Sequence, residues 1–323
     1  MTDVLLVNLL SPITLAFALG LLSRLVRSEF HLPRDIYLAL GIYLLFALGL
    51  KGGVELAKSP LSGIWLPMVV TLALGCVRPL TSYFVLRRLG RLGVPDAAGI
   101  AAHYGSVSAV TFIAALDFVR GMGAPAEGFL PTLLVLLESP GIQIALAVGV
   151  LHRNTTVREG STRDALHEVL TGRTMILLVG GLFVGYAVTP AAWQEVQPFF
   201  DGAIFKGALV LFLLEMGVVA GERLGDLKRV GAFLLAFGIL MPIVHGALGV
   251  AMGHLAGLSV GGATVLGTMS ASASYIAAPP AVRMTLPEAN PTFSITASLA
   301  ITFPFNIVIG IPIYYQIATW IGG

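Results

Sequence analysis

Apolar segments long enough to cross a lipid bilayer follow one another along nearly the whole of this chain. The core of a bilayer takes about 20 apolar residues per helical crossing. Ten candidate segments cover residues 4–26, 36–57, 63–87, 97–119, 129–151, 173–190, 201–222, 230–255, 260–283 and 292–320. Only 11% of the residues are charged, against about 25% in soluble domains. We therefore predict an all-α integral membrane protein with ten transmembrane helices.

A polar stretch, residues 152–172, divides the ten segments into two sets of five. We interpret residues 1–151 and 173–323 as two repeats joined by this linker. Short cytoplasmic loops are enriched in Lys and Arg. Alternate loops hold 14 of the 19 basic residues, namely Arg24, Arg27, Arg34, Arg87, Arg88, Arg91, Arg153, Arg158, Arg163, Arg173, Arg223, Lys228, Arg229 and Arg283. This asymmetry predicts a multi-pass protein with a cytoplasmic linker and both termini outside.

Composition also limits the chemistry that the chain can carry. The single cysteine, Cys76, excludes an intrachain disulfide and a CxxC metal site. The histidines show no pair with metal-ligand spacing. The net charge of +2 gives no indication of a nucleic-acid partner. We expect no cofactor and no metal other than a transported ion.

The two halves share short motifs at one spacing. A shift of 164 residues places SVSAV (106–110) on SASAS (270–274), and ESPGIQI (138–144) on TFPFNIV (302–308). With five crossings per half, the second half enters the membrane from the opposite side, so this similarity predicts an inverted repeat. The competing explanation is chance, because Ser, Ala and Gly are common in membrane helices.

The repeated motifs would interrupt the fourth and ninth segments near the middle of the membrane. Pro279 and Pro280 follow the second motif directly. Transporters built from inverted repeats bind their substrate at such interrupted helices, and half-helix N-termini bind small anions. We expect the serine clusters to hold a compact oxyanion. Close packing between helices is the alternative explanation for these small residues.

Ionisable and amide side chains inside the membrane mark a further part of the candidate site. Glu138 precedes Ser139 and Pro140 in the fifth segment, where it is our first candidate for binding a cation or ordering the site. A purely structural acid is the alternative. Asn306 is a second candidate, with contact between helices as its alternative role. Arg78 lies deep in the third segment, and we expect it to pair with an acid.

The segments HYGSVSAVTF, ESPGI and SASASYIAAPPAVR together resemble the sodium-dependent bicarbonate transporters first recognised in cyanobacteria. The resemblance implies a 5+5 inverted repeat with broken, crossing helices in spans 4 and 9, similar to bile-acid sodium symporters. Spans 1, 2, 6 and 7 would form a gate or scaffold, and spans 3–5 and 8–10 a mobile core. It also implies a homotrimer in the inner membrane that takes up inorganic carbon by Na⁺/HCO₃⁻ symport through an elevator-like movement.

The resemblance places bicarbonate between the crossing fourth and ninth spans, with sodium close by. Bicarbonate would bind at Gly105, Ser106, Ser108, Ser270, Ser272 and Ser274. Sodium would bind close by, and our candidates for its ligands are Glu138, Thr111 and Asn306. The central linker departs from the pattern, because it is longer in the cyanobacterial members, where a PII-like regulator docks. The resemblance therefore does not decide whether such a partner binds here.

Other functions stay open with less support. A symporter of another small anion, such as a carboxylate, would use the same site. A Na⁺/H⁺ antiporter is disfavoured, because the interruptions carry serines in place of paired aspartates. GSVSA is not the GxSxG of a serine hydrolase, so a membrane-embedded enzyme is disfavoured as well. A channel could use interrupted helices, and concentrative uptake would distinguish it from a transporter.

Overall fold

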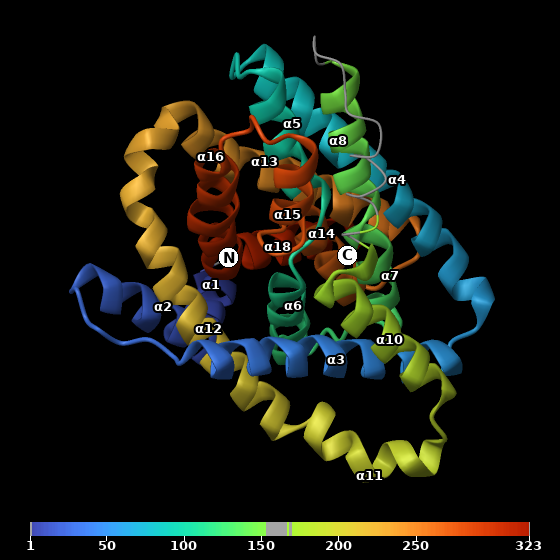
Figure 1. Ribbon diagram of the computed structural model, residues 1–323. Coiled ribbons are helices and arrows are strands. Elements are labelled where there is room, and N and C mark those ends of the chain that lie inside the picture. The colour runs from blue at the N-terminus through green and yellow to red at the C-terminus, as the bar shows by residue number, and fades with distance from the viewer. Residues whose placement is uncertain (1, 153–166, 168–169, 323) are drawn as a thin grey trace.

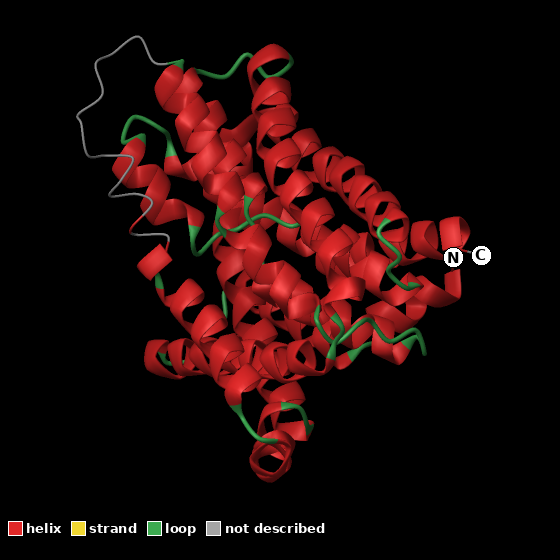
Figure 2. Ribbon diagram, turned by 90° about the vertical axis from the view of Figure 1, so that its right-hand side faces the viewer, coloured by secondary structure: helices red, strands yellow, loops and turns green. Residues whose placement is uncertain are grey.

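The computed structural model describes residues 2–152, 167 and 170–322, and the regular elements of this part are all helical (Figure 1). The first half forms α1 (Thr2–Leu9), α2 (Pro12–Leu25), α3 (Arg34–Lys58), α4 (Leu61–Arg88), α5 (Val94–Gly105), α6 (Ala109–Gly121), α7 (Leu130–Glu138) and α8 (Pro140–Leu151). Most of the predicted linker lies outside the described residues. The first and last helices contact each other, and Figure 2 shows the two termini on the same side of the molecule.

The second half has more interruptions than the first. It forms α10 (Arg173–Ala187), α11 (Pro190–Phe200), α12 (Ala203–Arg223), η1 (Leu224–Asp226), α13 (Leu227–Leu255), α14 (Val260–Ala271), α15 (Ala278–Thr285), α16 (Pro291–Ile295), η2 (Thr296–Thr302), α17 (Phe303–Phe305), η3 (Asn306–Gly310) and α18 (Ile311–Gly322). The two elements η2 and η3 are π-helical, and they flank the short α17 with Pro304. Such π segments in a continuous helix are frequent at functional sites.

Within the described residues, six helical stretches are long and apolar enough to cross a membrane, or seven if the bent pair α1 and α2 counts as one span. Ten were predicted. The difference has local causes: α10 has 15 residues, and α14 and α15 are each shorter than a bilayer is thick. In addition, one of the six stretches, Pro190–Leu255, comprises α11, α12, η1 and α13 and so contains two of the predicted segments.

Four helices pack as two reciprocal pairs, which we call the four-helix layer. α3 runs along α10, and α2 runs along α12. Glycine permits this close approach: a side chain at Gly49 of α3 would meet the Leu178 carbonyl oxygen of α10 at 2.5 Å. Small residues at such contacts are typical of membrane helices. The outer surface of the layer carries exposed apolar side chains, including Leu19 and Phe183, as lipid contact requires.

The remaining long helices form what we call the broken-helix bundle. α4 packs on α5 and α8 in the first half, while α13 packs on α14 and α18 in the second. α5 and α14 are each 12 residues long and both end in the interior of the bundle. Each is followed by a non-helical segment and then by another helix. These two interruptions bring the candidate residues together.

Candidate functional site

The first interruption separates α5 from α6. Ser106 and Ser108 both adopt extended backbone conformations. The hydroxyl of Ser108 accepts a hydrogen bond from the Thr111 amide at 3.2 Å, which makes Ser108 the N-cap of α6. A serine at this position satisfies an amide that the helix leaves without a partner. The helix therefore restarts where the sequence supplies a capping hydroxyl.

The second interruption lies between α14 and α15. Ser272 follows the last residue of α14 in an extended conformation. The Ser274 hydroxyl accepts from the Ala277 amide at 3.2 Å, as Ser108 does in the first break. α15 then begins with Pro279 in its first turn, where proline is favoured. The N-cap of α15 is Ala277, so Ser274 does not cap this helix as Ser108 caps α6. The 164-residue shift pairs Ser108 with Ser272.

The two interruptions contact each other directly. The Ser108 amide donates to the Ser272 hydroxyl at 3.0 Å, and the Ser274 amide donates to the His103 carbonyl at 2.8 Å. Each bond joins the first broken helix to the second. Backbone groups freed at one helix break thus find hydrogen-bond partners at the other. Backbone groups inside a membrane need such partners within the protein.

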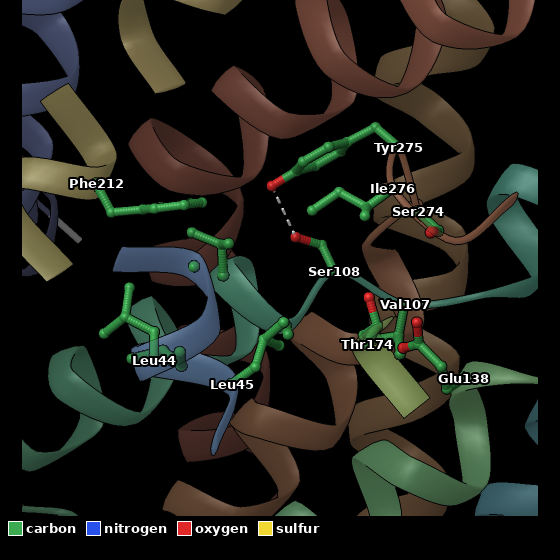
Figure 3. Close-up of a pocket in the computed structure, with 14 residues that line it drawn as sticks. Leu44, Leu45, Val107, Ser108, Glu138, Thr174, Phe212, Ser274, Tyr275 and Ile276 are labelled. Atoms are coloured by element: carbon green, nitrogen blue, oxygen red, sulfur yellow. Dashed lines mark hydrogen bonds between the residues drawn. The ribbon is translucent and has the colours of Figure 1, made fainter. Parts of the chain in front are cut away.

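A small cavity lies beside the crossing, between the broken-helix bundle and the four-helix layer (Figure 3). Its volume is about 50 Å³. Polar groups on its wall come from Ser108, Ser274, Glu138, Tyr275 and Thr174. The Ser108 hydroxyl donates to the Tyr275 hydroxyl at 3.2 Å. The opposite wall is apolar and is formed by residues of α3 and α12, among them Leu44, Leu45 and Phe212.

The six predicted anion residues occupy different positions. Ser108 and Ser274 line the cavity. Ser106 donates its hydroxyl to the Glu138 carbonyl at 2.7 Å and so ties the first break to the end of α7. Ser272 lies between the breaks and donates to the Met269 carbonyl at 2.8 Å. The sequence pattern did not distinguish the serines that line the cavity from those that bond to backbone carbonyls.

The other two anion candidates are packing residues in this conformation. Gly105 lies against Gly141, whose carbonyl oxygen would be 2.7 Å from a Cβ at position 105. Ser270 faces Gly249 of α13, and its hydroxyl has no hydrogen-bond partner in the part of the chain that the structure describes. Both residues hold the broken helices close to their neighbours.

The three predicted sodium residues are all buried. Glu138 lines the cavity, and its Oε2 has no hydrogen-bond partner among the described residues. The same holds for the Thr111 hydroxyl within this part of the chain. Asn306 uses both ends of its amide, donating to the Ala271 carbonyl at 3.0 Å and accepting from the Tyr314 hydroxyl at 2.9 Å. It joins η3 to the carbonyl end of α14.

The expectation that Arg78 pairs with an acid was wrong. Among the described residues, no carboxylate oxygen lies within 4.0 Å of this guanidinium. Instead, Arg78 donates to backbone carbonyls at both helix breaks. Burying a charge inside a membrane span is costly, so the position of Arg78 indicated a functional residue. The sequence alone did not show which groups contact its guanidinium.

The cavity combines two kinds of chemistry. The N-terminal ends of helices carry a partial positive charge and free amides, which favour an anion, and the serine hydroxyls beside them can donate hydrogen bonds. The unpartnered carboxylate oxygen of Glu138 is a ligand for a hard cation. Together, these groups suit the joint binding of a small anion and a small cation.

Comparison with known proteins gives one positive result. A family model described as the Na⁺-dependent bicarbonate transporter superfamily matches residues 12–319, nearly the whole chain. A search of curated protein sequences finds no significant match.

Proposed function

This chain belongs to the Na⁺-dependent bicarbonate transporter superfamily, and from that membership we propose that it imports bicarbonate by Na⁺ symport through the crossing of its broken helices. Because the family is one of transporters, the chain is not an enzyme. The observation that carries the proposal is the cavity of about 50 Å³, which both helix breaks and Glu138 line.

In this proposal bicarbonate occupies the cavity beside Ser108 and Ser274. A cavity of about 50 Å³ holds roughly four water-sized groups, which is the number of non-hydrogen atoms in bicarbonate. The negative charge faces the N-terminal end of α6, where the Ser108 hydroxyl can turn from Tyr275 to the anion. Gly105, Ser106, Ser270 and Ser272 shape the two breaks around it.

Sodium binds next to the anion, with oxygen atoms as ligands. Glu138 and Thr111 supply side-chain oxygens that have no hydrogen-bond partner within residues 2–152, 167 and 170–322. Asn306 contributes by holding the end of α14 in place. Binding Na⁺ offsets the carboxylate charge of Glu138, so that a second negative charge can enter the same cavity.

The packing supports a 5+5 inverted repeat similar to bile-acid sodium symporters. The pairing of α3 with α10 is matched by that of α2 with α12, as two inverted halves require. We identify the four-helix layer with the gate or scaffold, and the broken-helix bundle with the mobile core. The homotrimer, the inner membrane and the outside location of both termini complete the proposal. They rest on the resemblance and on the distribution of Lys and Arg.

Two further cavities at the layer–bundle boundary support an elevator-like movement. A wide cavity of about 710 Å³ shares Tyr275 with the small one and is also lined by Arg223 and Arg283. These arginines belong to the loops predicted to be cytoplasmic. A second cavity of about 260 Å³ is lined by Lys206 of α12 and Asp117 of α6. These two side chains form an ion pair at 2.8 Å. The core would therefore stand in its inward-facing position.

Uptake of labelled bicarbonate into proteoliposomes tests the function. An inward Na⁺ gradient is imposed at alkaline pH, which limits leakage as carbon dioxide, and K⁺ replaces Na⁺ as the control. We expect accumulation only with Na⁺. Ser108→Ala and Ser274→Ala should each raise the KM for bicarbonate about ten-fold or more, as expected for loss of a hydrogen bond to a charged group.

Ser23→Ala is the matched control, because the Ser23 hydroxyl bonds only to the Gly20 carbonyl of its own helix. Folded wild-type protein without Na⁺-dependent bicarbonate accumulation would contradict the proposal. Na⁺-dependent uptake of labelled formate or acetate in the same vesicles would then identify a carboxylate symporter.

A further inference from the structure

Arg78 occupies the centre of the broken-helix bundle and is fully buried. It lies on α4, followed by Pro79 within the same helix. Its Nη2 donates to three backbone carbonyls at the breaks: Tyr104 at 2.9 Å, Ser106 at 2.7 Å and Ser272 at 3.0 Å. One nitrogen thus joins both interrupted helices at a single point.

These three carbonyls belong to the negative ends of two half-helices. The last carbonyls of a helix lack partners within it, and the C-terminal end carries a partial negative charge. α5 and α14 bring two such ends together next to the anion site. Without a positive group between them, the ends would repel each other and any anion bound at Ser108 or Ser274.

The charge of Arg78 has no acidic counterpart in the described part of the chain. Its Nε and Nη1 atoms also lack hydrogen-bond partners there. Burial of an isolated charge in a membrane protein is expensive, and such residues usually mark an ion pathway. The helix ends offset part of this cost, and a bound anion would offset more. The arrangement thus favours a state in which the core holds an anion.

We propose that Arg78 is a positioning residue that clamps the carbonyl ends of both breaks and supplies the fixed positive charge on which bicarbonate affinity depends. The proposal rests on the proposed bicarbonate function. Because the guanidinium already fills the carbonyl cluster, Na⁺ is directed to the separate oxygens of Glu138 and Thr111. The residue does not line the cavity, so it acts through the backbone at Ser106 and Ser272.

The test compares Arg78→Gln, Arg78→Lys and wild type in the proteoliposome assay, with Arg88→Gln at the exposed end of α4 as the control. We expect Arg78→Gln to raise the KM for bicarbonate at least about ten-fold, as removal of a nearby unit charge should. The Na⁺ concentration for half-maximal uptake should change several-fold less. Arg78→Lys, which keeps the charge, should have a KM between the two.

Thermal unfolding with and without bicarbonate, at saturating Na⁺, gives a readout that does not require transport. The anion should raise the melting temperature of wild type and Arg78→Lys, but not that of Arg78→Gln. Folded Arg78→Gln with the wild-type KM overturns the inference, as does folded Arg78→Lys with a KM no better than that of Arg78→Gln. If Arg78→Gln does not fold, Arg78→Lys decides: a folded protein that bicarbonate stabilises supports the charge role, and any other result overturns it. Absence of uptake by wild type would instead refute the proposed function.

Discussion

Replacing Glu138 by Gln should weaken Na⁺ binding strongly, because no basic group of the described residues neutralises this carboxylate in place of Na⁺. Its side chain is 1% exposed, and no basic nitrogen in the described residues lies within 4.0 Å of it. A unit charge 4 Å from a cation contributes about 4 kcal/mol at an effective dielectric constant of about 20. Desolvation offsets part of this energy. A net loss of roughly 1.4–3 kcal/mol corresponds to a 10- to 100-fold weaker affinity.

The assay measures bicarbonate uptake as a function of Na⁺ concentration. Glu138→Gln should raise the half-maximal Na⁺ concentration by that factor. Binding alone is measured by thermal unfolding, since Na⁺ at about 100 times its Kd stabilises a one-site protein by about 2.7 kcal/mol. At the same Na⁺ concentration the variant should lose about 1.3 kcal/mol of this stabilisation for a 10-fold weaker affinity and about 2.3 kcal/mol for a 100-fold weaker one.

The matched control is Glu55→Gln, which removes a partly exposed carboxylate that pairs with Lys58 at 2.9 Å. It should leave the Na⁺ dependence within about two-fold of wild type, as expected for a surface ion pair. An unchanged half-maximal Na⁺ concentration in folded Glu138→Gln would refute the reasoning and remove Glu138 from the sodium site.

Two further predictions concern packing and movement. Gly105→Ala should lower the melting temperature by an amount equivalent to about 1–3 kcal/mol and reduce uptake, because its Cβ would lie 2.7 Å from the Gly141 carbonyl oxygen. Gly121→Ala, at the open end of α6, should change neither the melting temperature nor the uptake. Equal melting temperatures for Gly105→Ala and Gly121→Ala would contradict this explanation. Lys206→Glu should alter the uptake rate by breaking the ion pair with Asp117 between α12 and α6. The charge-reversed double variant with Asp117→Lys should restore it, and additive effects would show that the pair is not coupled to transport.

Several features of the fold could be predicted from residue patterns alone. Hydropathy identified the apolar segments, because each crossing of a bilayer must satisfy its backbone internally and present apolar side chains. The motifs around Ser108 and Ser274 identified the family, which the family model confirmed. The number of spans was less predictable. Mean hydropathy along the sequence does not show that Ala271 ends one helix and that Ala278 begins the next.

The candidate site was predictable in location but not in detail. The sequence placed six anion candidates at the two interruptions, and the structure places Ser108 and Ser274 at the cavity. Ser106 is turned instead toward the Glu138 carbonyl. Which way a serine hydroxyl points depends on backbone groups of other helices, and these are distant in the chain. No local pattern contains that information.

Composition and the order of apolar segments determined by themselves that this chain folds as a helical membrane protein, since burial in lipid acts on each segment separately. Arg78 shows what needed the assembled molecule. Its position within a span was evident from the sequence, and an acidic partner was the reasonable expectation. The carbonyls of Tyr104 at the end of α5, of Ser106 just after it and of Ser272 just after α14 meet the guanidinium instead. They become available only because both helices end where they cross, so their convergence is a property of the packed helices.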